Sequence, residues 1–259
     1  KLYGDAVRWF HDPGIADIVA SGSWRSLARQ SYASTVGVNP GSVHLNLPFR
    51  EPLTGKAIDL SSERLPRTQI LGSIGLSDSE LQRAVALFES QKGVIIAGRG
   101  CGDASAISDL AESLGWPVLA DSRSGCQGIP ESVVHFDSLI RCHAFVEHHV
   151  PEVVLRIGES PSSKVLSQYV TKSGALQVHV SAFENTFDAD SLVLMHISCD
   201  PTTFCRGISR LIKAASDPNH LSQWVSADQK ARATIAKEFA SSQNALNAPQ
   251  VAFVSRSSL

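Results

Sequence analysis

The sequence predicts an α/β fold built on a parallel, doubly wound sheet of five or six strands. Two observations carry this prediction. Short apolar runs such as "GVIIAG" at 93–98 are bounded by glycines, which is typical of strands buried on both faces. Segments with the apolar spacing of amphipathic helices alternate with these runs along the chain. Strands that alternate with helices form parallel sheets with helices on both faces.

The first 53 residues are expected to form a small structure of their own. They are predicted to contain two helices and a strand, at residues 1–11, 23–36 and 42–47. Ser23 is a suitable N-cap for the second helix. Pro48 and Pro52 lack the amide hydrogen that a sheet ladder requires, so the strand is expected to end near Leu47. A stiff, extended exit follows it.

Residues 54–77 differ in composition from the segments on either side. They are rich in serine, glycine, proline, arginine and threonine, and they show no clear hydrophobic periodicity. A structureless loop of this length is uncommon inside a compact domain. We therefore predict a linker at 54–77, between a first domain at 1–53 and a second domain that begins at residue 78.

Residues 78–216 carry the pattern of the main domain, and 217–259 are expected to form a charged helix followed by a linker. The predicted helices of the main domain lie at residues 78–91, 103–115, 143–149, 162–174 and 201–216. The predicted strands lie at residues 93–98, 117–121, 152–158, 176–181 and 192–198. The chain starts and stops within helical patterns, so we expect it to be a segment of a longer enzyme.

Composition and charge argue against several classes of protein. The formal net charge of −2 does not favour a nucleic-acid or anionic-membrane partner. No apolar run reaches the length of a membrane span, and the first residues do not resemble a signal peptide. The five cysteines lack the spacing of a structural zinc site, and unpaired thiols are typical of a reducing compartment. A cytoplasmic protein is expected.

Ligands of an open parallel sheet bind beyond the carboxyl ends of its strands, so the segments that follow strands are the first candidates. "GRGCGD" at 98–103 follows a strand and opens a helix, as a phosphate-binding loop does. Its glycines do not follow the G-x-G-x-x-G pattern, and Asp103 would repel a phosphate at the helix N-terminus. We interpret the segment as a tight turn capped by Asp103.

"GESPSSK" at 158–164 is the stronger candidate. Ser162 or Ser163 can cap the following helix, and Lys164 falls in its first turn, where a cation opposes the helix dipole. A residue that is unfavourable for its local structure, at a position that lines a crevice, is typical of a functional site. Backbone amides, a hydroxyl and a cation together suit a carboxylate. The alternative interpretation is a solvated surface lysine.

The other polar residues do not form a catalytic set. Four histidines lie close together in the sequence, at residues 135, 143, 148 and 149. The adjacent pair points in two directions on a helix, so a shared metal ion is not expected. Asp121 and Arg123 are typical of a local ion pair, and Arg156, within a strand, of a buried structural pairing. The sequence predicts a ligand crevice without a catalytic residue.

One segment resembles a known family. "HLNLPFREPL" at 44–53 is similar to the junction between the pyrimidine-binding and central domains of thiamine diphosphate enzymes. It most specifically resembles the 2-succinyl-5-enolpyruvyl-6-hydroxy-3-cyclohexene-1-carboxylate (SEPHCHC) synthases of menaquinone biosynthesis. "WPVLADSRSG", "VLRIGESPSSKVL" and "VHVSAFENTFDAD" agree with that family in the same order. The resemblance covers nearly the whole chain.

The resemblance implies a Rossmann-like central domain at 78–216, preceded by the tail of a pyrimidine-binding domain at 1–53. Residues 217–259 would lead toward a pyrophosphate-binding domain that the chain lacks. The family adds decarboxylated 2-oxoglutarate to isochorismate, with thiamine diphosphate and Mg²⁺ as cofactors. The regions that bind both cofactors lie outside this chain, so the chain alone is expected to be inactive. Active sites form between subunits in this family, which implies a homodimer or homotetramer.

The resemblance also assigns a role within "GESPSSK". In the family, the equivalent turn contributes a basic group to the substrate site, and Lys164 matches that position, with Ser162 and Ser163 as helpers. Some relatives carry a second basic residue where this chain has Val165, which leaves one cation instead of two. The resemblance implies no catalytic residue and no metal ligand in this chain.

Two other functions stay open on the sequence. One is the central domain of an acetolactate-synthase-like enzyme, which would hold FAD. The "PFREPL" junction and the lack of a dinucleotide-binding loop count against it. The other is a sensing domain that binds a small anion or aromatic acid in the sheet crevice, using Arg123, Arg156 and Lys164. Binding of FAD, nucleotides or aromatic acids would separate these possibilities.

Overall fold

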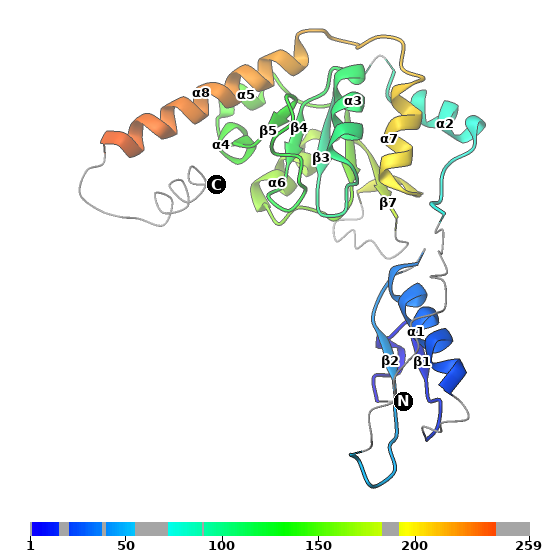
Figure 1. The fold of residues 1–259 in the computed structure, drawn as a ribbon. Helices are drawn as coiled ribbons and strands as arrows, with labels where there is room; N and C mark the ends of the chain where they lie inside the picture. The colour runs from blue at the N-terminus through cyan, green and yellow to red at the C-terminus, as the bar shows by residue number, and fades with distance from the viewer. Residues whose placement is uncertain are drawn as a thin grey trace. The chain divides into compact units, whose positions relative to one another are not determined.

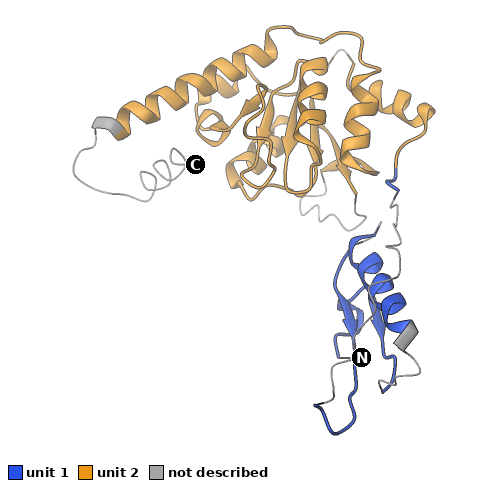
Figure 2. Cartoon of the chain, in the orientation of Figure 1, with its two compact units in different colours: residues 1–74 blue, residues 75–259 orange. Residues whose placement is uncertain are grey.

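The computed structural model describes residues 2–15, 21–37, 40–54, 72–89, 91–182 and 192–241. The chain forms two compact units, Lys1–Ile74 and Gly75–Leu259 (Figure 2). Most of the predicted linker, at 55–71, and the end of the chain beyond residue 241 lie outside the described residues. The domain limits at 53, 77 and 216 therefore stay predictions.

The first unit contains a short two-stranded sheet and one long helix. Its elements are the 3-10 helix η1 (Gly4–Ala6), strand β1 (Trp9–His11), helix α1 (Ser21–Val36) and strand β2 (Val43–Leu45). β1 and β2 are parallel, with Trp9 opposite Val43. The predicted helix at 1–11 is wrong, because Trp9–His11 forms a strand that pairs with Val43–Leu45. β2 ends before Pro48, as predicted.

The second unit is an α/β structure with one six-stranded sheet (Figure 1). Its strands are β3 (Gly93–Ala97), β4 (Val118–Ala120), β5 (Ser132–Val133), β6 (Val153–Ile157), β7 (Leu176–Ser181) and β8 (Val193–Ser198). Its helices are α2 (Asp78–Val85), α3 (Ala104–Leu114), α4 (Phe136–Ile140), α5 (His143–Val146), α6 (Lys164–Ser173), α7 (Pro201–Ser209) and α8 (His220–Ser241). The predicted fold class is confirmed.

The strand order explains where a ligand crevice can form. The sheet runs β5-β4-β3-β6-β7-β8, and every neighbouring pair is parallel. The chain builds outward from β3 to β5, returns to the centre at β6, and then builds outward on the other side. β3 and β6 are therefore adjacent strands whose following connections diverge, which is the topological switch point of a doubly wound sheet.

Each face of the sheet has its own apolar core. Alternate strand residues point to opposite faces, so Ile95 belongs to one core and Ile96 to the other. α2, α3 and α7 cover the first core, around Phe88, Trp116 and Phe204. α4, α6 and α8 cover the second, where Trp224 of α8 is fully buried. The two layers hold the sheet rigid beneath the loops at its carboxyl edge.

Helix ends in the second unit follow the predicted local rules. Gly115 ends α3 with a φ of 70°, a left-handed conformation that glycine adopts without the steric cost of a Cβ. Ser77 caps α2 through a capping box with Glu80. α2 ends at Val85, several residues before the predicted limit of 91. Within the described residues, no helix combines the length and apolar composition of a membrane span.

Candidate functional site

The loops that follow β3 and β6 form the floor of the candidate site. Because the two strands are adjacent and parallel, residues 98–103 and 158–163 leave the sheet at the same edge. The amide of Glu159 donates to the carbonyl oxygen of Arg99 at 2.8 Å, and the amide of Gly98 donates to that of Ile157 at 3.0 Å. Backbone hydrogen bonds thus join the two loops, and the side chains of Arg99 and Glu159 also form an ion pair at 4.0 Å.

Glycine is required where these loops meet. A Cβ on Gly98 would lie 1.7 Å from the carbonyl oxygen of Glu159. Gly158 has a φ of +78°, and a Cβ there would lie 2.4 Å from the carbonyl oxygen of Arg99. The buried ring of His179 supports this junction, with Nε2 2.7 Å from the carbonyl oxygen of Gly158. The sequence analysis missed His179, because it lies inside an ordinary strand pattern.

The loop after β3 is a capped turn, as predicted. The carboxylate of Asp103 accepts from the amide of Ser105 at 3.1 Å and caps α3. Its other oxygen lies 2.9 Å from Arg206. A carboxylate of the chain itself therefore occupies the N-terminus of α3. An anionic phosphate would be repelled there, so the arrangement is not a phosphate-binding loop.

The loop after β6 leads into α6, and Ser163 is its N-cap. The Ser163 hydroxyl accepts from the amide of Leu166 at 3.1 Å and donates to a carboxylate oxygen of Asp137 at 2.6 Å. Ser163 thereby fixes the start of α6 against α4. The hydroxyl of Ser162 is left exposed to solvent. Of the two serines predicted as possible N-caps, Ser163 is the N-cap in the structure.

Lys164 is the first residue of α6 and is exposed. Among the described residues, no side chain or backbone group forms an ion pair or hydrogen bond with its ammonium group. Its position opposes the helix dipole, and the first turn of α6 contains no acidic residue. A cation held in this way is available to an anion from solution.

The other cations near this edge are already paired. Arg123 lies 3.1 Å from Asp121 and 3.4 Å from Glu159, which confirms the local ion pair predicted for Asp121 and Arg123. Arg156 donates to the side-chain oxygen of Gln177 at 3.3 Å and to the hydroxyl of Ser160. Arg156 is therefore paired as predicted, but it is half-buried and not buried. Two of the three cations of the sensing hypothesis, Arg123 and Arg156, are thus already paired.

Four of the five cysteines are buried, and all five are free thiols. Cys101 and Cys126 lie beneath the crevice with their Sγ atoms 3.6 Å apart. The contact with Cys126 and burial both raise the pKa of Cys101. Burial raises the pKa of Cys199 to about 11. Neutral, buried thiols are poor nucleophiles, so Cys101 and Cys199 act as apolar side chains of the core.

Three of the four clustered histidines contact other side chains of the second unit. His135 lies 3.1 Å from Asp228, and His143 lies 3.3 Å from Glu147. His149 stacks on Phe145, with ring centroids 4.0 Å apart. In the part of the chain that the structure describes, no three His, Cys, Asp or Glu side chains are grouped as metal ligands would be.

Comparison with known proteins assigns the chain to a family. The family model described as "Middle domain of thiamine pyrophosphate" matches residues 72–253, most of the chain. The chain belongs to this middle-domain family. Among solved structures, this chain shares its fold with part of benzoylformate decarboxylase from Polynucleobacter necessarius. That match has a TM-score of 0.54 at 15% identity and covers 83% of this chain and 40% of the other.

The curated relatives compared with this chain are named SEPHCHC synthases. This chain is 30% identical to the SEPHCHC synthase of Haloquadratum walsbyi over 275 residues, which are 96% of this chain and 44% of the relative. It is 31% identical to the SEPHCHC synthase of Chloroflexus aurantiacus over 253 residues, 90% of this chain and 42% of the relative. The chain spans less than half the length of these relatives. The predicted resemblance to SEPHCHC synthases is confirmed.

The loop after β3 does not fit the diphosphate group of thiamine diphosphate. The N-terminus of α3 carries the carboxylate of Asp103, and the backbone of Glu159 fills the space beside Gly98. A diphosphate requires amide or cationic donors at such a position, and the described residues present no grouped ligands for its metal ion.

Proposed function

We propose that the chain is the central part of a SEPHCHC synthase, which adds decarboxylated 2-oxoglutarate to isochorismate in menaquinone biosynthesis. The family match, the two synthase relatives and the shared fold support this proposal. It includes a pyrimidine-domain tail at 1–53, a linker at 54–77, a central domain at 78–216 and an exit toward a further domain at 217–259. In that protein, thiamine diphosphate supplies the electron sink for decarboxylation.

The role of this chain in the reaction is to hold the carboxylate of a substrate. The observation that carries this role is the position of Lys164. Its side chain is exposed and has no ion pair or hydrogen bond among the described residues. It lies at the capped start of α6, at the carboxyl edge of the sheet where β3 and β6 end. The exposed hydroxyl of Ser162 can donate to the same carboxylate. Ser163 keeps both residues in place through its bonds to Leu166 and Asp137. Orientation of the substrate is the contribution expected of such contacts.

Three further features belong to the proposal. The chain contributes no catalytic residue and no cofactor ligand, so it is inactive alone. Thiamine diphosphate and Mg²⁺ are bound by other parts of the longer polypeptide. That polypeptide acts in the cytoplasm as a homodimer or homotetramer. The unpaired thiols among the five cysteines support the cytoplasmic location.

The test is Lys164→Ala in the longer polypeptide that contains this chain. Loss of a charge-assisted hydrogen bond to a substrate carboxylate raises the KM for that substrate about tenfold and leaves kcat within about twofold. Steady-state kinetics with 2-oxoglutarate and isochorismate varied in turn identify which carboxylate is bound. Lys213→Ala is the matched control, since Lys213 is an exposed lysine that follows α7 and lies away from the switch-point edge.

The possible outcomes test the role of Lys164 and the synthase assignment separately. If both variants have the kinetics of the parent, Lys164 does not contact substrate, although the synthase assignment stands. If the longer polypeptide has no SEPHCHC synthase activity, the proposed function is wrong whatever Lys164 does. The chain of 259 residues is assayed beside it, and turnover by that chain alone would contradict its proposed dependence on other domains.

A further inference from the structure

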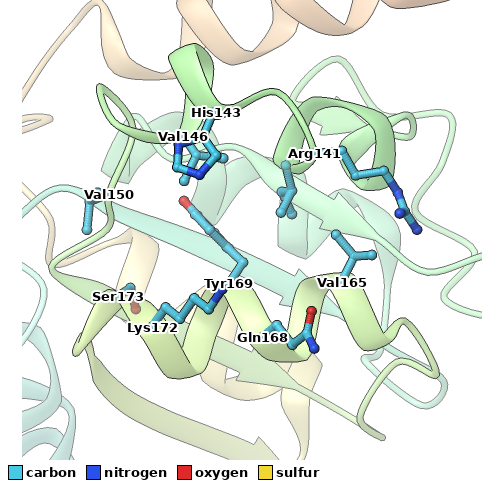
Figure 3. A pocket seen from close by; sticks show the side chains of 10 residues that line it. Arg141, His143, Val146, Val150, Val165, Gln168, Tyr169, Lys172 and Ser173 are labelled. Atoms are coloured by element: carbon cyan, nitrogen blue, oxygen red, sulfur yellow. The ribbon is translucent and has the colours of Figure 1, made fainter.

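A pocket in the second unit lies between α6 and the segment from α4 to β6 (Figure 3). Its volume is about 350 Å³, within the range of sites that bind small molecules. Val165, Gln168, Tyr169 and Lys172 reach it from α6, because these positions share one face of a helix. Lys164 does not line the pocket, although its neighbour Val165 does.

The apolar residues of the pocket are mainly aliphatic. Ile140, Val146, Val150 and Val165 line it. Val150 is 47% exposed, so an apolar ligand would remove a branched side chain from water. The ring of Tyr169 rises from α6 toward α5 (Figure 3), and its hydroxyl donates to the carbonyl oxygen of His149 at 2.6 Å. The ring of Tyr169 therefore lines the pocket, and its hydroxyl is already hydrogen-bonded within the protein.

The polar groups of the pocket provide one uncommitted cation. Arg141 lies 3.2 Å from Asp137, and His143 lies 3.3 Å from Glu147, so both are paired. Lys172 is exposed and has no ion pair or hydrogen bond to another described residue.

Gln168 is the second free polar group. It lies one helical turn before Lys172 on the same face, and among the described residues its side-chain amide also has no hydrogen bond. The hydroxyl of Ser173 is committed, because it donates to the carbonyl oxygen of Val170 at 2.7 Å. An ammonium group and a side-chain amide can each donate to a carboxylate.

We propose that this pocket binds an amphipathic monocarboxylate with an alkyl body, of the size of a medium-chain fatty acid. The carboxylate binds Lys172 and Gln168, and the alkyl chain covers Val146, Val150 and Val165. The aliphatic lining favours an alkyl chain over a stacked ring system. The single unpaired cation favours one negative charge over two. The proposal does not depend on the synthase assignment.

The test is calorimetric titration of the full chain with octanoate, and with octylammonium as a probe of equal length and opposite charge. Octanoate is expected to bind at least tenfold more tightly than octylammonium. Lys172→Gln weakens octanoate binding about fivefold, the effect of losing one exposed ion pair. Lys213→Gln is the matched control and leaves binding unchanged, since its neighbour Ile212 packs on the opposite core.

A second variant tests the apolar part of the pocket. Val150→Asp places a carboxylate beside the alkyl chain and reduces octanoate affinity more than tenfold. Val150 is nearly half exposed, so the variant is expected to keep the unfolding temperature of the parent. Backbone amide shifts in the parent should be confined to residues 140–150 and 165–173.

Three results would overturn the proposal. The first is no binding of octanoate at concentrations up to about 10 mM, weaker than any useful small-molecule site. The second is equal affinity for octylammonium, which would leave Lys172 without a role. The third is an unchanged affinity in both Lys172→Gln and Val150→Asp, which would place the octanoate elsewhere on the chain.

Discussion

Gly98→Ala should destabilise the second unit strongly, because two loops meet at this residue without room for a side chain. The new Cβ would lie 1.7 Å from the carbonyl oxygen of Glu159, and real Cβ atoms essentially never come closer than 3.0 Å to such an atom. The loops must separate by more than 1 Å. That movement breaks the 2.8 Å hydrogen bond from the amide of Glu159 to Arg99. Overpacking and a lost backbone bond together cost about 2–6 kcal/mol.

The measurement is urea unfolding followed by tryptophan fluorescence, since Trp116 and Trp224 are both buried in the second unit. Gly128→Ala is the matched control: its new Cβ meets no atom within 4 Å, and its φ lies outside the left-handed region. The control should keep or slightly raise the free energy of unfolding, by up to about 1 kcal/mol. If both variants unfold at the same urea concentration, the close approach of the two loops is wrong.

Three other perturbations test the same unit. Ser163→Ala removes the cap of α6 and should lower the free energy of unfolding by about 1–2 kcal/mol, whereas exposed Ser162→Ala should change it by less than about 0.5 kcal/mol; equal effects would contradict the assigned cap. Cys142, the exposed thiol, should react with a thiol reagent under native conditions while the four buried ones react only after unfolding; rapid loss of all five thiols would refute this. Burial lowers the pKa of His220 below its usual 6.5, so the stability that its neutral ring provides is complete above that pH and declines as the pH falls below it. His220→Gln should therefore lose less stability than the parent on acidification, and parallel pH profiles of the unfolding temperature would exclude this role.

The fold of the second unit could be predicted because its local signals agree with its global structure. β3 is an apolar run and β6 is one except for Arg156, as is typical of strands with helices on both faces. β5 was missed, because Ser132–Val133 is too short to produce a pattern. In the first unit, Trp9–His11 was predicted as helix although it pairs with Val43–Leu45. Pairing between distant segments leaves no trace in local periodicity.

The candidate site was predictable to a smaller extent. The position of Lys164 followed from its place after a strand and at the start of a helix. The support for that position did not, because Asp137 reaches Ser163 from α4 and His179 reaches Gly158 from the next strand. The pocket around Lys172 was also missed. Its walls come from three elements whose relative placement is set by packing and has no counterpart in sequence spacing.

The central pairing of β3 with β6 determines how the second unit can fold. Lys92 and Glu152, which meet at the start of this pairing, are 60 positions apart. The two innermost strands thus come together only after a long stretch of chain has closed into a loop, at an entropic cost before any native contact is gained. β3 also leaves the ribosome well before its partner exists. Until β6 arrives, β3 has one edge open, and this apolar edge is the part of the unit most exposed to misassociation during synthesis.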